Sequence, residues 1–202
     1  MERKPNEFFY PNGKFSEEKA KEAYFEMMNY YNYPIPESFS GDKFWCPDFD
    51  MGDFVNVGMG GVIWVNHNHD DGGYMGHEIF LLPGQMIPEH AHVAVEGVCP
   101  AKKEAWLVRH GSIYNFSIKK EPTGFVDGVE IPESQREHCV VNSSDKLVAG
   151  ELDYLKTESE MHFMIAGPEG AIVTEFATYH DNKALRFTHP KLQFEIKDEA
   201  LS

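Results

Sequence analysis

The hydrophobic and polar positions along the chain change period at about residue 50. Before that point, apolar and aromatic residues recur three and four positions apart, as on one face of an α-helix: Tyr24, Met27, Met28 and Tyr31. Ser16 followed by Glu17 and Glu18 predicts the helix start, because a hydroxyl caps free N–H groups and acids favour the positive end of the helix dipole. The helix should end before Pro34. We expect its apolar face to pack against the outside of a sheet.

The first fifteen residues are unusually aromatic. Their aromatic side chains are Phe8, Phe9, Tyr10 and Phe15. A free tail is typically poor in aromatic residues. We therefore expect an extended arm that packs on the barrel or on a second subunit.

From residue 50 onward, short runs rich in β-branched and aromatic residues alternate with Gly, Asp, Asn and Pro. The runs typical of strands are 54–57, 61–65, 77–82, 105–108, 112–118, 139–141, 153–155, 161–165 and 171–177. Many short strands with turn signals between them indicate a sandwich or a barrel. We predict an all-β fold in one domain, with an arm and an α-helix over residues 1–44, a barrel over 45–190 and a tail over 191–202.

Composition and charge limit the possible partners. A chain of 202 residues with 42% apolar residues can bury a substantial core in one domain. A net charge of −15 and a pI near 5.0 argue against nucleic acid and against an anionic membrane, because both would repel such a surface. Three widely spaced cysteines do not predict a disulfide framework. The sequence begins without an apolar leader, and its apolar runs are too short to span a bilayer, so we expect a cytoplasmic protein.

His90 and His92 are the centre of the candidate chemistry. They lie two positions apart, so in a strand both imidazoles point to the same face. A divalent metal held there needs one or two further donors, usually a carboxylate and another histidine from neighbouring strands. Glu104 and His162 are the best candidates, although His162 could also be a core histidine. Glu96 is the alternative carboxylate, but it lies in a stretch typical of a loop, whereas Glu104 opens a run with strand character.

The spacing around this pair resembles the first cupin motif, with a longer loop than usual between the second histidine and the glutamate. The residues that carry the resemblance are Gly84, His90, His92, Glu104 and Gly111. It implies a cupin fold, which is a double-stranded β-helix or jelly-roll-like barrel, with the metal site inside. We expect a turn at Gly111 and a tight hairpin at residues 167–170, shortly after His162.

Further segments resemble the cupin D-lyxose isomerases over roughly residues 45–190. They are residues 48–54 with Gly58, 81–92, 102–104, 162–178 and 186–187. The resemblance implies a Mn²⁺-dependent, homodimeric aldose-ketose isomerase whose ligands are His90, His92, Glu104 and His162. Zn²⁺, Fe²⁺, Co²⁺ or Ni²⁺ would also suit such donors. The expected substrate is a free sugar, in the pair D-lyxose/D-xylulose or D-mannose/D-fructose.

Lys102 and Glu175 are the candidate catalytic residues. The reaction moves a proton from C2 to C1 through an enediol, and a divalent ion that holds both oxygens would stabilise the charge developing on them. Lys102 lies two positions before Glu104 and would face the same cavity, where it could hydrogen-bond O1 or O2, unless it is a solvated loop residue. Glu175 lies in an apolar strand, where burial would raise its pKa and suit it to act as the general base.

Trp106, Tyr114 and Arg186 are the candidate substrate-binding residues. The two aromatic residues could line the sugar pocket or fill the barrel, and Arg186 could bind a hydroxyl group or form an ion pair. His67 and His69 lie in a polar turn and are expected at the surface. The sequence reveals no partner for the other histidines, His77, His110, His138, His180 and His189.

Three other functions share parts of this pattern. Two histidines and a carboxylate also suit a non-haem Fe(II) dioxygenase, although a fourth protein ligand would occupy a position that O₂ or substrate needs. A non-catalytic sugar-binding cupin would need neither Lys102 nor Glu175. A cupin phosphosugar isomerase, of the glucose-6-phosphate type, would need a basic cluster or a Gly-rich anion nest, which the sequence near the site lacks. We therefore expect an unphosphorylated sugar.

Overall fold

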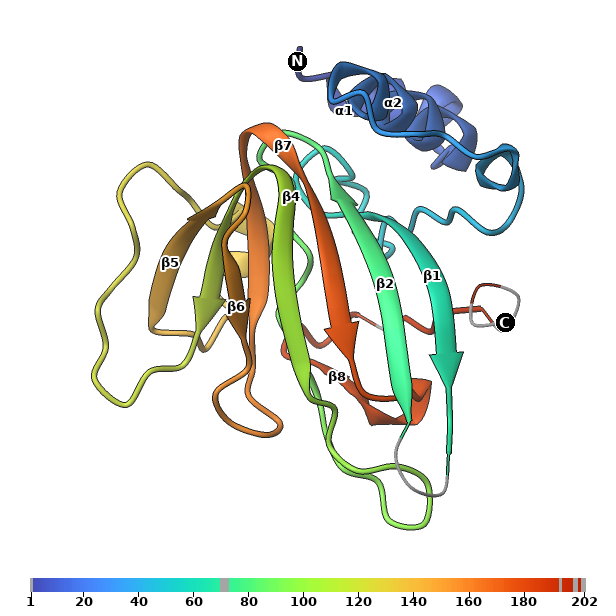
Figure 1. Cartoon of the computed structure of the whole chain (residues 1–202). Helices are drawn as coiled ribbons and strands as arrows, with labels where there is room; N and C mark the ends of the chain where they lie inside the picture. Colours follow the sequence, from blue (N-terminus) through green and yellow to red (C-terminus); the bar gives the residue numbers. More distant parts are fainter. Residues whose placement is uncertain (1, 70–72, 193, 198–199, 201–202) are drawn as a thin grey trace.

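The computed structural model describes residues 2–69, 73–192, 194–197 and 200. Its strands form two antiparallel sheets (Figure 1). The main sheet has the order β1-β2-β7-β4-β5, with β6 paired to β4, and the second sheet consists of β3 and β8. The strands are β1 Gly60–His67, β2 Tyr74–Leu81, β3 His90–His92, β4 Glu104–Ser117, β5 Ser143–Val148, β6 Leu152–Tyr154, β7 Phe163–Ala177 and β8 Leu185–Phe187. The helices are α1 Asn6–Phe9, α2 Glu17–Tyr30 and α3 Glu133–Arg136, with 3₁₀ helices at Pro11–Gly13, Glu37–Ser40 and Asn182–Ala184.

The two longest strands, β4 and β7, pair with each other on both sides of a bend. Residues 167–170 form a bulge in β7, and pairing continues beyond it with Ile113 opposite Ala166. Gly111 has a φ of +72°, and a Cβ there would lie 2.0 Å from the carbonyl oxygen of Gly170, so only glycine fits this close approach. The turn expected at Gly111 and the hairpin expected at residues 167–170 are therefore wrong, because both strands bend there and continue.

Helix α2 packs on the outer face of the main sheet near β1 and β2 (Figure 1). The Oγ atom of Ser16 accepts a hydrogen bond from the backbone N–H of Lys19, which confirms the predicted start of the helix. The predicted apolar face is buried together with three residues of the sheet: Tyr24, Met27 and Met28 with Val62, Phe80 and Ile172. The helix therefore covers one end of the outer sheet face.

The N-terminal arm is not extended. It contains helix α1 and the 3₁₀ helix Pro11–Gly13, and the side chain of Phe9 is fully buried in the hydrophobic cluster beneath α2. The expected packing of the arm on the sheet is confirmed, whereas its expected extended conformation is wrong.

Two predicted strands are absent from the described structure. Residues 54–57 form a turn in which the carbonyl oxygen of Asp53 accepts hydrogen bonds from the N–H groups of Asn56 and Val57. Residues 139–141 precede β5, and the N–H groups at positions 140 and 141 donate to the carboxylate of Glu89 at 3.0 Å. The Glu89 carboxylate thus accepts the hydrogen bonds that the carbonyl groups of a neighbouring strand would otherwise have accepted.

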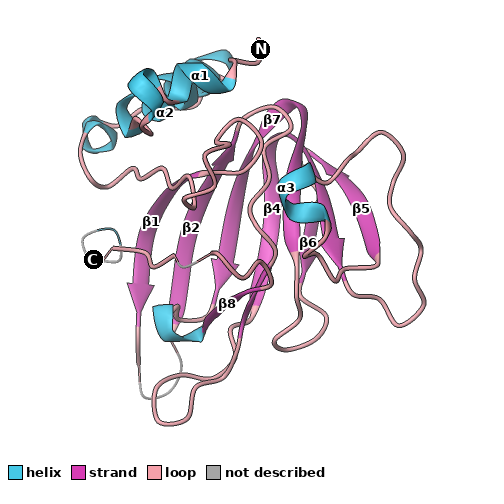
Figure 2. Cartoon of the chain, turned by 180° about the vertical axis from the view of Figure 1, so that it is seen from behind, coloured by secondary structure: helices cyan, strands magenta, loops and turns pink. Residues whose placement is uncertain are grey.

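The second sheet faces the inner side of the main sheet, as the view from behind shows (Figure 2). Along β2, alternate residues point inward: Met75, His77, Ile79 and Leu81. This interior, between the main sheet and the segments around β3 and β8, contains a large hydrophobic cluster and the candidate site. The predicted all-β fold with an α-helix packed outside is confirmed. None of the described helices is both long enough and apolar enough to cross a bilayer.

Candidate active site and its metal-binding residues

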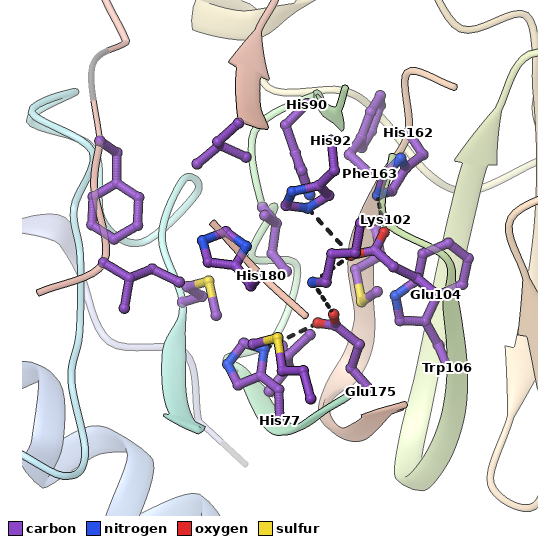
Figure 3. A pocket seen from close by; sticks show the side chains of 18 of the residues that line it. His77, His90, His92, Lys102, Glu104, Trp106, His162, Phe163, Glu175 and His180 are labelled. Atoms are coloured by element: carbon purple, nitrogen blue, oxygen red, sulfur yellow. Dashed lines mark hydrogen bonds and ion pairs between the residues drawn. The ribbon is translucent and has the colours of Figure 1, made fainter. Parts of the chain in front are cut away.

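His90, His92 and His162 converge in one pocket inside the barrel (Figure 3). His90 and His92 are the first and last residues of β3, so both project from the same face of that strand. The backbone of His90 exchanges two hydrogen bonds of 3.0 Å with that of His162, which brings the segment before β7 alongside β3. One ligand nitrogen of each ring lies within 4.8 Å of the others. The expected third histidine is therefore beside the first two.

For two of these rings, His90 and His162, hydrogen bonds fix which nitrogen faces the centre. The Nδ1–H of His90 donates to the carbonyl oxygen of Pro88, and that of His162 donates to the carbonyl oxygen of Glu160, each at 2.8 Å. Each ring then has its Nε2 lone pair available as a metal ligand, which is the usual arrangement of ligating histidines. Burial and the neighbouring His162 lower the pKa of His90 to about 4, and burial and Lys102 hold the pKa of His92 well below its usual value. Burial lowers the pKa of His162, but the neighbouring Glu104 carboxylate outweighs burial and raises that pKa. Neutral imidazoles are the form that binds a metal, so a proton and a metal would compete for His162.

Glu104, the first residue of β4, adds a carboxylate to this group. Its Oε1 atom lies 3.2 Å from Nε2 of His92, and its Oε2 atom lies 3.1 Å from Nε2 of His162. Burial opposes ionisation, but the Lys102 ammonium outweighs it and holds the pKa of Glu104 well below its usual range. Glu96, the alternative carboxylate, is exposed in the loop between β3 and β4.

The donor set fits a divalent metal ion. Oε2 of Glu104 is buried and lacks a hydrogen-bond partner among the described residues. Such an atom is costly to bury unless something binds it. Three imidazoles and one carboxylate suit Mn²⁺, Fe²⁺, Co²⁺, Ni²⁺ or Zn²⁺, and four donors leave positions for substrate oxygens in an octahedral ion.

A series of ion pairs and hydrogen bonds leads from Glu104, beside the histidines, across the pocket (Figure 3). The Nζ atom of Lys102 lies 2.7 Å from Oε1 of Glu104 and 2.5 Å from Oε1 of Glu175. The other oxygen of Glu175 accepts a hydrogen bond of 3.0 Å from Nδ1–H of His77. All four side chains are buried. Lys102 is therefore not a solvated loop residue, and it does share a cavity with Glu104.

The pKa of Glu175 differs from the sequence-based expectation. Burial raises it, as expected, but the Lys102 ammonium and the hydrogen bond from His77 outweigh burial and hold the pKa at about 2. Burial likewise lowers the pKa of Lys102, and the two carboxylates outweigh it so that the pKa is raised. The expected raised pKa of Glu175 is therefore wrong, because the ion pair with Lys102 dominates.

The three candidate substrate-binding residues have different positions. Trp106 lines the pocket, with its ring centroid 5.3 Å from that of His162. Tyr114 lies beyond the bend of β4, where the strand packs into a separate hydrophobic cluster outside this pocket. Arg186 is exposed, and its guanidinium donates to the carbonyl oxygens of Lys183 and Leu185. Its neighbours on β8, at positions 185 and 187, line the pocket, so strand alternation directs Arg186 away. Tyr114 and Arg186 therefore lie outside this pocket.

Two histidines that the sequence left without a partner also line the pocket, His77 and His180. The alternation of inward residues along β2 was a usable signal for His77. His180 follows β7 in a loop and carries no such signal. His67 and His69 are exposed, as expected.

Comparison with known proteins places the chain among sugar isomerases. No family model matches it. It is 33% identical over 153 residues to a D-lyxose/D-mannose isomerase of Thermosediminibacter oceani, covering 75% of this chain and 80% of that protein. It is 31% identical over 152 residues to a D-lyxose ketol-isomerase of Cohnella laeviribosi, covering 75% and 79% of the two chains.

Solved structures show the same fold at low sequence identity. The Cellulomonas parahominis L-ribose isomerase with L-psicose matches 86% of this chain and 91% of its own, with a TM-score of 0.67 and 14% identity. The E204Q mutant of Acinetobacter sp. DL28 L-ribose isomerase, in complex with L-ribose, matches 80% and 79% of the two chains, with a TM-score of 0.61 and 16% identity. The sequence relationships decide the family: the chain belongs to the D-lyxose ketol-isomerases, enzymes that interconvert aldose and ketose sugars.

Proposed function

We propose that this enzyme is a metal-dependent isomerase of free sugars that interconverts D-lyxose with D-xylulose or D-mannose with D-fructose. The observation that carries the proposal is the meeting of His90, His92, His162 and Glu104 with the Lys102–Glu175 ion pair in one buried pocket. The relatives' names support the choice of sugars. Family membership disfavours the dioxygenase and the non-catalytic binding protein.

The pocket favours an unphosphorylated substrate. Among the described residues that line it, Lys102 is the only lysine or arginine, and it is already paired with two carboxylates. A phosphate group would bring about two further negative charges into a pocket with no free cation to receive them.

His90, His92, Glu104 and His162 would hold the metal, for which we propose Mn²⁺. When bound, the ion would act as a Lewis acid on the sugar carbonyl and the neighbouring hydroxyl group. Lys102 would donate a hydrogen bond to the sugar oxygen that gains negative charge, because its ammonium already lies between the metal-binding carboxylate and Glu175.

Glu175 would move the proton. Its carboxylate takes the proton from C2, and the C–H electron pair forms the C1=C2 bond as the C1=O1 π pair moves to O1. The O2 hydroxyl proton passes to O1, an electron pair on O2 forms the C2 carbonyl, and the C1=C2 pair takes back the proton from Glu175 at C1. A carboxylate with a pKa of about 2 is a weak base. It becomes stronger when Lys102 turns its hydrogen bond toward a sugar oxygen, since the ion pair is what counters the effect of burial. Trp106 would contact the apolar face of the sugar.

We also propose that the protein is a homodimer and that the second copy covers the outer face of the main sheet beyond α2. Strand register places four half-exposed apolar side chains on this face: Tyr74, Leu152, Tyr154 and Phe176. A net charge of −15 opposes self-association elsewhere on the surface. Phe176→Glu should give a monomer in sedimentation equilibrium, whereas Tyr30→Glu, which changes an equally exposed aromatic residue on α2, should not.

The test of the proposed reaction begins with metal-free protein. Adding Mn²⁺ should restore ketose formation from D-lyxose and D-mannose, and glucose 6-phosphate should remain unchanged. Oxygen uptake is measured in the same samples. The proposal would be rejected if D-lyxose and D-mannose were not converted while another substrate consumed oxygen or a phosphosugar was isomerised.

A further inference from the structure

His180 is buried in the pocket and has no role in the proposed metal site or the proton transfer. Its side chain is among those that line the pocket, and its ring centroid lies 5.3 Å from that of His92 (Figure 3). It is 2% exposed. Its Nδ1 atom is buried and has no hydrogen-bond partner within the described part of the chain.

Two asparagine side chains hold His180 in place. The amide of Asn66, on β1, accepts from the backbone N–H of His180 at 2.9 Å and donates to its carbonyl oxygen at 3.0 Å. The Oδ1 atom of Asn182 lies 3.2 Å from Nε2 of the His180 ring. A loop residue fixed at both backbone and ring is preorganised for a specific contact.

Asn182 also decides which ring nitrogen carries the hydrogen. Its Oδ1 accepts from the backbone N–H of Ile196 at 2.9 Å, and its Nδ2 donates to the carbonyl oxygen of Ile196 at 2.8 Å. If the amide were flipped, its NH₂ group would face the backbone N–H of Ile196, which is also a donor, so the orientation of the Asn182 amide is fixed. Because Oδ1 is an acceptor, Nε2 of His180 must be the donor, and Nδ1 keeps a lone pair that has no hydrogen-bond partner among the described residues.

From this geometry we infer that His180 binds the substrate, with Nδ1 accepting a hydrogen bond from a hydroxyl group at C3 or C4 of the sugar. The inference rests on the proposed function, because O1 and O2 are taken to be held at the metal end with Lys102. D-lyxose and D-mannose have the same configuration at C2, C3 and C4. One acceptor directed at C3 or C4 therefore serves both sugars and selects for their shared stereochemistry.

The test removes each partner of this contact in turn. The value of kcat/KM is measured for D-lyxose, 3-deoxy-D-lyxose and 4-deoxy-D-lyxose with the wild-type enzyme and with His180→Leu. In the wild type, loss of the contacted hydroxyl should lower kcat/KM by roughly ten- to hundredfold, because a buried acceptor is left unpaired. With His180→Leu, the kcat/KM values for D-lyxose and for the deoxy sugar that lacks the contacted hydroxyl should differ by less than about twofold.

His180→Asn is the matched second variant, because its short amide can place an oxygen near the position of Nδ1. It should recover part of the discrimination between D-lyxose and the deoxy sugar. A purely structural role for His180 predicts a different result, in which both variants lower kcat/KM for all three sugars by the same factor. That result would overturn the inference.

A measurement on the wild-type protein tests the contact even if the variants fail to fold. In protein loaded with diamagnetic Zn²⁺, the ¹⁵N signal of His180 Nδ1 should move when D-lyxose saturates the site and move less with the deoxy sugar that lacks the contacted hydroxyl. An unchanged signal at saturation would reject the contact. Wild-type protein that binds D-lyxose and shifts this signal, yet isomerises no aldose, would instead reject the proposed function alone.

Discussion

The two ends of the pocket are held in place by different means. At the end with the three histidines, His90 and His162 donate from Nδ1 to the carbonyl groups of residues two positions earlier, Pro88 and Glu160. At the other end, Glu175 is held by side chains 73 and 98 residues away in the sequence, Lys102 and His77. Local contacts therefore fix which histidine nitrogen faces the proposed metal site, whereas long-range contacts lower the pKa of the proposed base.

Glu104 is the side chain through which the two ends meet, so changing it should have the largest effect. Glu104→Gln removes the charged donor next to His92 and His162. We expect the bound metal to be lost and kcat/KM to fall by more than about a thousandfold, since metal assistance supplies several kcal/mol of transition-state stabilisation. Metal content and kcat/KM are measured together. Glu96→Gln, an exposed change in the preceding loop, is the control and should alter neither.

Glu175→Gln should separate the two ends. The metal content should stay at the wild-type level, while kcat falls by about 10²- to 10⁴-fold, which is the usual contribution of a general base. Glu78→Gln is a matched control. Glu78 is buried in the neighbouring strand but faces outward, where it accepts from Tyr33 and Thr174. Unchanged turnover in Glu175→Gln would remove this residue from the mechanism.

Lys102→Met should lower kcat/KM at neutral pH by about ten- to hundredfold, because the ammonium no longer hydrogen-bonds the sugar oxygen. It should also change the pH profile. In the wild type the pKa of Glu175 is about 2, so its carboxylate is ionised at any ordinary assay pH. Without Lys102, burial is less opposed and the pKa rises, so the base form is lost as pH falls through the new value. Wild-type and variant profiles that run parallel down to acid pH would contradict this account.

His77→Phe should have the smallest effect. The ring of His77 stacks on Trp45 at 5.7 Å and an interplanar angle of 11°, and phenylalanine can keep that contact while losing the hydrogen bond to Glu175. We expect kcat to fall by about tenfold with metal content and KM unchanged, as for other residues that orient a reacting group. His67→Phe, an exposed change at the end of β1, is the control. Equal kcat for His77→Phe and wild type would leave His77 with a packing role only.

Prediction from sequence worked best where the signal was local. The cap at Ser16, the apolar face of α2 and the shared face of His90 and His92 all follow from residue spacing, and the structure has them. The choice of Glu104 over Glu96 also rested on strand character, and Glu104 is the carboxylate beside the histidines. Prediction failed at residues 167–170, where glycine and proline are compatible with both a hairpin and a bulge. Only the continued pairing of β7 with β4 decides between them.

By itself, the sequence determined the strand-rich architecture, the helix at its start, the histidine pair and the resemblance to sugar isomerases, because periodicity and short motifs are properties of neighbouring residues. The tertiary structure decided that His77 and His180 enter the pocket, that Tyr114 and Arg186 do not, and that the pKa of Glu175 is lowered and not raised. The physical reason is that pKa and pocket membership depend on which charges and faces the folded barrel brings within a few ångströms. For Glu175 those partners are Lys102 and His77, which the sequence places far apart.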